Sequence, residues 1–232
     1  MSTLPAPSCD MSGKDHWIFD LDNTLYPPTC RLFDQIDKRM GAFITDQLGI
    51  SPAEARVLQK RYFREYGTTL SGLMAHHNME PARYLAYVHD IDYSVIRADP
   101  GLSAALARLP GRKLIFTNGS RDHAINVLNR LGISAHFDHV HDIADSDYIP
   151  KPRALAYERM IAGSGADPAR SAMFEDIAHN LEVAHGMGMA TVLVKFENGH
   201  PDAEHIATGN GSEAYVDCTT TDLSHFLTRL TA

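Results

Sequence analysis

Residues 16–22 of this 232-residue chain read His16-Trp17-Ile18-Phe19-Asp20-Leu21-Asp22, and they carry the strongest indication of its fold. Their apolar run ends abruptly at Asp20, which is typical of a short strand buried in a sheet. Asp20 and Asp22 therefore place two carboxylates at the carboxyl end of that strand. In open α/β sheets, ligands bind beyond the carboxyl ends of the strands. The stretch thus predicts a core strand that brings an acidic pair to a binding site.

Strands and helices are expected to alternate after Pro100. Asp122 can cap one of these helices, which would then end at Gly132. The expected strands are 113–116, 138–140, 172–174, 190–194 and 214–216, and the expected helices are 122–131, 153–161, 177–186 and 223–230. Such alternation implies a mostly parallel sheet with helices on both faces. We therefore predict a three-layer, Rossmann-like α/β fold.

Residues 28–98 show a helical pattern instead. Apolar residues recur at helical spacing from Leu32 to Ile44, and Ser51-Pro52-Ala53-Glu54 is a capping box with Pro at the first helical position. Pro81 is expected to open another helix. The sequence therefore predicts a helical cap at 28–98, inserted into a core of 15–27 and 99–232, after a loose tail at 1–14. An insert directly after the first strand could hang over the site as a lid.

Composition narrows the class of protein. The formal net charge is −8, which argues against a nucleic-acid polymer as partner. Cys9, Cys30 and Cys218 are widely spaced without a CxxC, which argues against a zinc site and favours reduced cysteines. The N-terminus does not resemble a signal peptide, and no apolar run approaches the ~20 residues needed to span a bilayer. We expect no membrane partner and a cytoplasmic location.

Polar side chains follow three further expected strands or loops. Thr117 and Asn118 end one strand, Lys151 stands between two prolines, and Glu175-Asp176 follow another strand. Each has an ordinary alternative: polar residues often close strands, a lysine in a turn is usually on the surface, and Asp176 could cap a helix. Adjacent acids at one strand end are costly, however, unless a cation or hydrogen bonds compensate them.

In chain order these sites are DxD, Thr-Asn, Lys and Glu-Asp. That order and spacing resemble the haloacid dehalogenase superfamily, whose motifs are DxDxT, Ser/Thr, Lys and an acidic pair. The stretches DNTLYPP, YGTTLSGLMAHH, TNGSRDHA and MFEDIAHNL are similar to the pyrimidine 5′-nucleotidase branch. Ile177 departs from the serine that eukaryotic members of that branch tend to carry after the acidic pair.

The resemblance implies a Mg²⁺-dependent phosphatase. Asp20 would attack phosphorus and form an aspartyl phosphate, and Asp22 would be the acid/base partner. Asp20, the Asp22 backbone carbonyl, Asp176 and Glu175 are the expected metal ligands, because Mg²⁺ prefers hard oxygen donors. Thr117, Asn118 and Lys151 would stabilise the transferring phosphoryl group.

The resemblance implies a nucleoside 5′-monophosphate as substrate, and a pyrimidine one in preference. Arg121 could reach its phosphate or sugar, and His76 or His77 could face it from the cap, although each could equally be solvated. The enzyme alternatives are hydrolysis of another small phosphate ester, such as a sugar phosphate or phosphoglycolate, a phosphomutase and a dehalogenase. A second acid at Asp22 argues against the dehalogenase, because it serves proton transfer to an oxygen leaving group. A catalytically silent phosphate-binding module is the alternative outside the enzymes, and it would be expected to lack at least one of Asp20, Asp22, Lys151 or Asp176.

Overall fold

A six-stranded parallel sheet forms the centre of the computed structural model, which describes residues 10–196 and 209–231. The strand order is β3-β2-β1-β4-β5-β6, so the first strand lies in the middle. The strands are β1 (His16–Phe19), β2 (Arg112–Phe116), β3 (His139–His141), β4 (Ser171–Glu175), β5 (Ala190–Val194) and β6 (Cys218–Thr220). The prediction of a parallel α/β sheet is confirmed.

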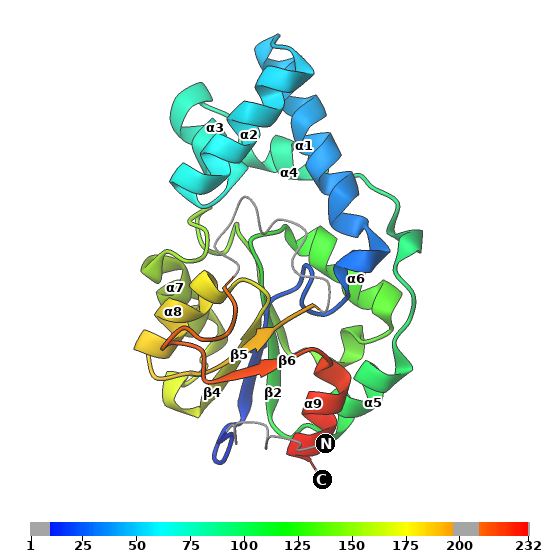
Figure 1. The fold of residues 1–232 in the computed structure, drawn as a ribbon, viewed down its shortest axis with the longest axis vertical. Helices are drawn as coiled ribbons and strands as arrows, with labels where there is room; N and C mark the ends of the chain where they lie inside the picture. Colours follow the sequence, from blue (N-terminus) through cyan, green and yellow to red (C-terminus); the bar gives the residue numbers. More distant parts are fainter. Residues whose placement is uncertain (1–9, 197–208, 232) are drawn as a thin grey trace.

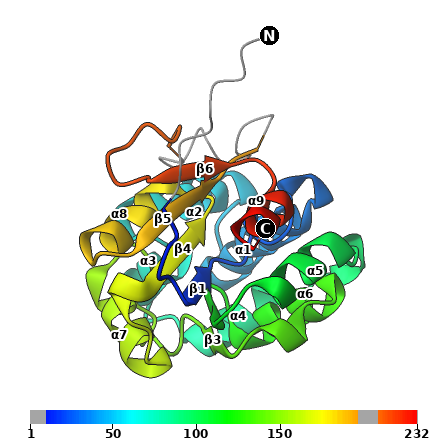
Figure 2. The ribbon, with the colours of Figure 1, turned by 90° about the horizontal axis from the view of Figure 1, so that it is seen from below.

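Helices cover both faces of the sheet, as Figure 2 shows. The helices of this core are α5 (Pro100–Arg108), α6 (Arg121–Leu131), α7 (Ala154–Ser164), α8 (Ala178–Gly186) and α9 (Leu223–Leu230). Trp17 and Phe19 of β1 point into a buried cluster with α5, α6 and α9, whereas Ile18 points into a second cluster with α7 and α8. This alternation follows from the two-residue period of a strand. Burial on both faces explains why β1 is apolar throughout.

Four helices form a separate group beyond the carboxyl ends of the strands (Figure 1). They are α1 (Leu32–Leu48), α2 (Pro52–Tyr66), α3 (Thr69–His77) and α4 (Pro81–Val88), and we call them the helical unit. The unit has its own hydrophobic cluster, which also takes in Ile143 and Tyr148 from the core. The expectation of helices between 28 and 98 is therefore met by the elements observed.

Local sequence signals set several helix ends. Ser51 and Glu54 make the reciprocal capping-box hydrogen bonds at the start of α2. Gly67 ends α2 with φ of 84°. A Cβ there would lie 3.4 Å from Pro150 Cγ and 3.5 Å from the Lys151 carbonyl, so the end of α2 lies close to the loop that carries Lys151. Glycine suits both the left-handed backbone and this close approach.

Some boundaries differ from those expected. The N-cap of α6 is Ser120, whose hydroxyl accepts from the backbone N–H of His123, and Asp122 lies in the first turn. The last strand is 218–220 instead of 214–216, because only the later segment pairs with β5. The predicted tail falls mostly outside the described residues.

Two findings bear on the expected environment of the chain. Cys218 is disulfide-bonded, so the expectation that all cysteines are reduced was wrong. Within the described ranges, no helix is long and apolar enough to cross a membrane.

Candidate active site

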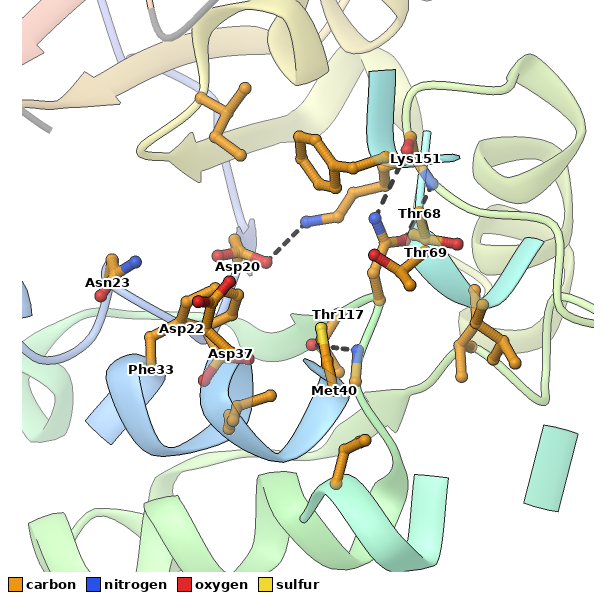
Figure 3. Close-up of a pocket in the computed structure, with 18 of the residues that line it drawn as sticks. Asp20, Asp22, Asn23, Phe33, Asp37, Met40, Thr68, Thr69, Thr117 and Lys151 are labelled. Atoms are coloured by element: carbon orange, nitrogen blue, oxygen red, sulfur yellow. Dashed lines mark hydrogen bonds and ion pairs between the residues drawn. The ribbon is translucent and has the colours of Figure 1, made fainter. Parts of the chain in front are cut away.

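Asp20 lies at the centre of a group of buried charged side chains. Its backbone N–H continues the pairing of β1 with β4 by donating to the Phe174 carbonyl over 2.9 Å, which places Asp20 beside Glu175. Lys151 Nζ donates to Asp20 Oδ1 at 2.6 Å and to Glu175 Oε2 at 2.7 Å. Figure 3 shows Lys151 pointing toward Asp20. The loop lysine that the sequence left open as a possible surface residue is 2% exposed and paired with two acids.

Asp176 joins this group through Thr24. The Thr24 hydroxyl lies 3.2 Å from both Asp20 Oδ2 and Asp176 Oδ1. One carboxylate oxygen from each of Asp20, Glu175 and Asp176 lies within 4.8 Å of the others. Three buried carboxylates thus lie close together, two of them paired with the Lys151 ammonium, and they carry an excess of negative charge if all are ionised.

Burial and mutual repulsion perturb the acids of this group. Burial and the neighbouring Glu175 raise the pKa of Asp20 to about 7, although Lys151 acts in the opposite direction. Burial likewise raises the pKa of Glu175 to about 7, against Lys151 and together with Asp176. Burial disfavours the charged form of Lys151, but Asp20 and Glu175 outweigh it and raise the pKa of the lysine.

This donor set fits a hard divalent cation. Carboxylate oxygens are the ligands that such ions prefer, and a cation would compensate the excess negative charge. It would also favour the ionised form of Asp20, whose pKa is otherwise raised. The cluster of Asp20, Glu175 and Asp176 could therefore hold a divalent metal ion.

Asp22 has a different environment, although it is only two residues from Asp20. His123 Nε2 lies 2.7 Å from Asp22 Oδ1, and the Tyr26 hydroxyl donates to the same oxygen. Burial opposes the charge of Asp22, but these two hydrogen bonds and nearby His89 outweigh burial and lower its pKa. The two carboxylates are therefore held by separate partners, and their pKa values are shifted in opposite directions.

Thr117 and Asn118 lie at the end of β2 as expected, and both line the pocket. The Gly119 N–H donates to Thr117 Oγ1 over 2.9 Å. The Asn118 amide binds the backbone of Lys151, accepting from its N–H at 2.9 Å and donating to its carbonyl at 3.4 Å. The side chain of Asn118 thus joins the end of β2 to the loop that carries the lysine.

The helical unit forms the opposite wall of this pocket. Its apolar lining comes from Phe33, Ile36, Met40, Phe63, Leu70, Leu85 and Val88. Figure 3 shows Phe33, Asp37 and Met40 of α1 among the residues that line the same pocket as Asp20 and Thr117. Gln59 Oε1 and the Tyr84 hydroxyl are buried in this lining, and neither has a hydrogen-bond partner among residues 10–196 and 209–231. One pocket therefore joins a charged end to a mainly apolar end.

Three residues that the sequence suggested as substrate contacts do not line this pocket. Arg121 is exposed, and its guanidinium donates to Asp145 at 2.6 Å and to the Val140 carbonyl at 2.9 Å. His76 and His77 are exposed at the end of α3 and contact tyrosine hydroxyls of α2. The helical phase of α3 turns these histidines away from the pocket, and Thr69 and Leu70 line it instead.

Sequence reasoning also missed residues that contact the acids. His123, Tyr26 and Thr24 hold the two aspartates, and Gln59, Asp37 and Lys60 line the helical end of the pocket. One signal was present: His123 lies on the buried face of α6 together with Ala124 and Val127, where a fully buried polar ring needs partners. No local pattern marks Gln59 or Tyr84, because their role depends on how the helices pack.

A parallel α/β sheet with a buried aspartate, lysine and acidic pair at its carboxyl edge defines a class of hydrolase. Residues 15–188 match the family of haloacid dehalogenase-like hydrolases, and the chain belongs to that family. A curated relative, Phosphate metabolism protein 8 of Saccharomyces cerevisiae, is 29% identical over 223 residues, which cover 88% of this chain and 68% of the yeast protein.

Solved structures share the fold at low sequence identity. The HAD phosphatase of Thermococcus onnurineus aligns with a TM-score of 0.59 and 19% identity, covering 93% of this chain and 97% of that chain. The L-2-haloacid dehalogenase of Xanthobacter autotrophicus, solved with chloropropionic acid covalently bound, aligns with a TM-score of 0.58 and 16% identity, covering 94% and 98%. Both a phosphatase and a dehalogenase thus share this fold, so the activity must be inferred from the site.

Proposed function

We propose that this protein is a Mg²⁺-dependent phosphomonoester hydrolase that acts through an aspartyl phosphate on Asp20. The observation that carries the proposal is the pair of aspartates with separate partners, Asp20 in the acidic cluster and Asp22 on His123. A dehalogenase needs a nucleophilic carboxylate but no acid to protonate its halide. A second, separately held carboxylate is what an oxygen leaving group requires.

The residues around Asp20 would bind the phosphoryl group and orient the nucleophile. Lys151 and Thr24 each hold one oxygen of Asp20, which fixes the plane of its carboxylate. Bound at Asp20 and Asp176, Mg²⁺ would supply positive charge that offsets repulsion between the anionic nucleophile and the phosphate. Both oxygens of Glu175 already accept hydrogen bonds, from Lys151 and from the backbone N–H groups of Asp176 and Ile177. We therefore assign Glu175 mainly to holding Lys151.

The reaction then has two balanced steps. Asp20 attacks phosphorus, the bond from phosphorus to the ester oxygen breaks, and Asp22, which enters this step in its protonated form, gives that proton to the leaving alcohol. Water next attacks the phosphoryl group, Asp22 takes a proton from it, and the bond from phosphorus to Asp20 breaks to release phosphate. Thr117 and Lys151 would donate hydrogen bonds to phosphoryl oxygens in both steps.

We further propose a nucleoside 5′-monophosphate, preferably a pyrimidine one, as substrate. The apolar wall formed by the helical unit suits a planar base, and Gln59 Oε1 and the Tyr84 hydroxyl offer unpaired polar atoms for its edge. The sequence stretches that resemble those of pyrimidine 5′-nucleotidases support the smaller base. On this proposal, the helical unit is the cap that covers the phosphate end and excludes water.

A phosphate-release panel tests the proposal. It compares UMP, CMP, AMP, GMP, a sugar phosphate and phosphoglycolate, each with Mg²⁺ and with excess chelator. We expect pyrimidine nucleotides to give the highest kcat/KM, chelator to abolish release and added Mg²⁺ to restore it. Full activity in chelator would contradict the mechanism, and a preference for phosphoglycolate would contradict the substrate. Chloride release from 2-chloropropionate in the same panel would favour a dehalogenase.

A further inference from the structure

His123 lies behind Asp22 and is the most buried of the groups that contact it. Its side chain is fully buried, and its Nε2 lies 2.7 Å from Asp22 Oδ1. Its Nδ1 lies 3.0 Å from the Tyr93 hydroxyl, which also donates to the His89 carbonyl over 3.0 Å. Both ring nitrogens are therefore engaged, and the ring cannot rotate without losing two hydrogen bonds.

A second aromatic ring packs against one face of the His123 imidazole. The imidazole of His89 stacks on it with centroids 4.3 Å apart and planes 12° apart. His89 Nδ1 lies 2.8 Å from the hydroxyl of Ser120, the N-cap of α6. His89 and Tyr93 both belong to the segment that connects α4 to α5. The position of His123 is thus set jointly by α6 and by the connection from the helical unit to the core.

The two oxygens of Asp22 have unequal surroundings. Oδ1 accepts from Tyr26 and contacts His123. Oδ2 lies 3.7 Å from the place where a Cβ on Gly119 would be, next to Thr117 at the phosphate end of the pocket. With Oδ1 held by two groups, rotation of the carboxylate is blocked, and Oδ2 stays on the side of Asp22 that faces Gly119 and the end of β2.

We infer that His123 is a positioning residue that holds Asp22 Oδ1 so that Oδ2 is aimed at the ester oxygen of the substrate. The inference rests on the proposed phosphatase function. Misplacing a general acid by about 1 Å can cost on the order of 10²-fold in rate. The loss should depend on the leaving group, because a good leaving group needs little protonation.

The test compares two substitutions of His123. Each keeps a polar group at the position of one ring nitrogen and loses the other. In His123→Gln, the side-chain amide reaches the place of Nε2 and can still contact Asp22. In His123→Asn, the amide reaches the place of Nδ1, so the contact with Tyr93 survives and the contact with Asp22 is lost. Rapid-quench measurement of the phosphorylation step follows both variants on UMP and on p-nitrophenyl phosphate.

We expect His123→Asn to lower the rate on UMP about 10- to 100-fold and the rate on p-nitrophenyl phosphate by less than about 3-fold. His123→Gln should retain most of the UMP rate. Calorimetry should give the same Mg²⁺ affinity for both variants, because Asp20, Glu175 and Asp176 are unchanged. Equal losses on both substrates, or a Gln variant as impaired as the Asn variant, would overturn the inference.

Tyr26→Phe provides a second, independent variant. It removes the other hydrogen bond to Oδ1 and leaves the histidine in place. If His123→Asn fails to fold, as judged by thermal unfolding, Tyr26→Phe decides: a loss confined to UMP supports the inference, and a uniform loss overturns it. A wild-type protein that releases no phosphate from any ester would instead overturn the proposed function.

Discussion

The two ends of the pocket are built in different ways. At the core end, charged side chains from two strand ends and a loop satisfy one another, as when Lys151 binds both Asp20 and Glu175. At the helical end, the lining is mainly apolar, and Gln59 Oε1 and the Tyr84 hydroxyl have no hydrogen-bond partner in the described part of the chain. Groups that are already paired are preorganised for chemistry, whereas unpaired buried groups gain most from a ligand. On the proposed function, the core end would perform the reaction and the helical end would select the substrate.

The largest effect is expected for Asp20→Asn. Because no phosphoenzyme can form without the carboxylate, phosphate release should fall by at least about 10⁴-fold, to background. Asp37→Asn is the matched change at the helical end, and it should alter the rate on p-nitrophenyl phosphate by less than about 10-fold. Quench-flow with labelled substrate detects the intermediate, and a phosphoenzyme in Asp20→Asn would exclude this residue as the nucleophile.

Asp22→Asn should have the next largest effect. It distinguishes the role of Asp22 from that of Asp20. It keeps the nucleophile and removes proton transfer, a contribution of about 10²–10⁴-fold. The phosphorylation rate should therefore fall by that amount on a nucleotide and by much less on p-nitrophenyl phosphate. Single-turnover kinetics on both substrates measure this, and equal losses would show that the assigned role of Asp22 is wrong.

At the helical end, Gln59→Leu and Tyr84→Phe should raise KM for the preferred nucleotide about 3- to 10-fold, the equivalent of one hydrogen bond. The kcat on p-nitrophenyl phosphate should stay unchanged, because that substrate carries no base. Thr45→Val is a matched control. Thr45 Oγ1, on α1, is also buried and has no hydrogen-bond partner among the described residues, but Thr45 does not line the pocket. A KM shift in the control as large as in the test variants would refute base recognition by Gln59 and Tyr84.

The smallest effect concerns stability and the raised pKa values of the core end. With pKa values of about 7, folded Asp20 and Glu175 bind protons that their unfolded forms, at 3.8 and 4.5, have released. Their contribution to stability is therefore complete only below the unfolded pKa values of 3.8 and 4.5, and it is lost progressively as the pH rises from there through the folded value of about 7. Mg²⁺ competes with these protons, so it should raise the unfolding temperature by a few degrees more at pH 8 than at pH 6.5.

Comparing each pH with and without Mg²⁺ cancels the titration of the distant histidines. Glu175→Gln removes one of the two acids and should reduce the difference between the two pH values. A Mg²⁺ effect of equal size at pH 6.5 and pH 8 would show that the acidic cluster is not where the cation binds.

Much of the core could be predicted because its signals are local. An apolar run that ends in Asp20 specifies both a buried strand and the place of its carboxylate, and β5 was expected with the bounds observed. The strand expected at 214–216 was wrong because a short edge strand is defined by its partner, and only 218–220 pairs with β5. Likewise, the α6 cap was placed at Asp122 when Ser120 makes the capping hydrogen bond.

Sequence alone determined the α/β class, the helices inserted after the first strand, and the acids and lysine gathered at the sheet edge. Each of these follows from residue type and spacing, because the carboxyl ends of parallel strands meet at one edge. Tertiary structure decided which partners hold each acid. His123 lies 101 residues from Asp22 and still contacts it, while His76 and His77 are turned away from the pocket by the phase of α3. Contacts between distant segments depend on helix packing and rotation, which no short pattern encodes.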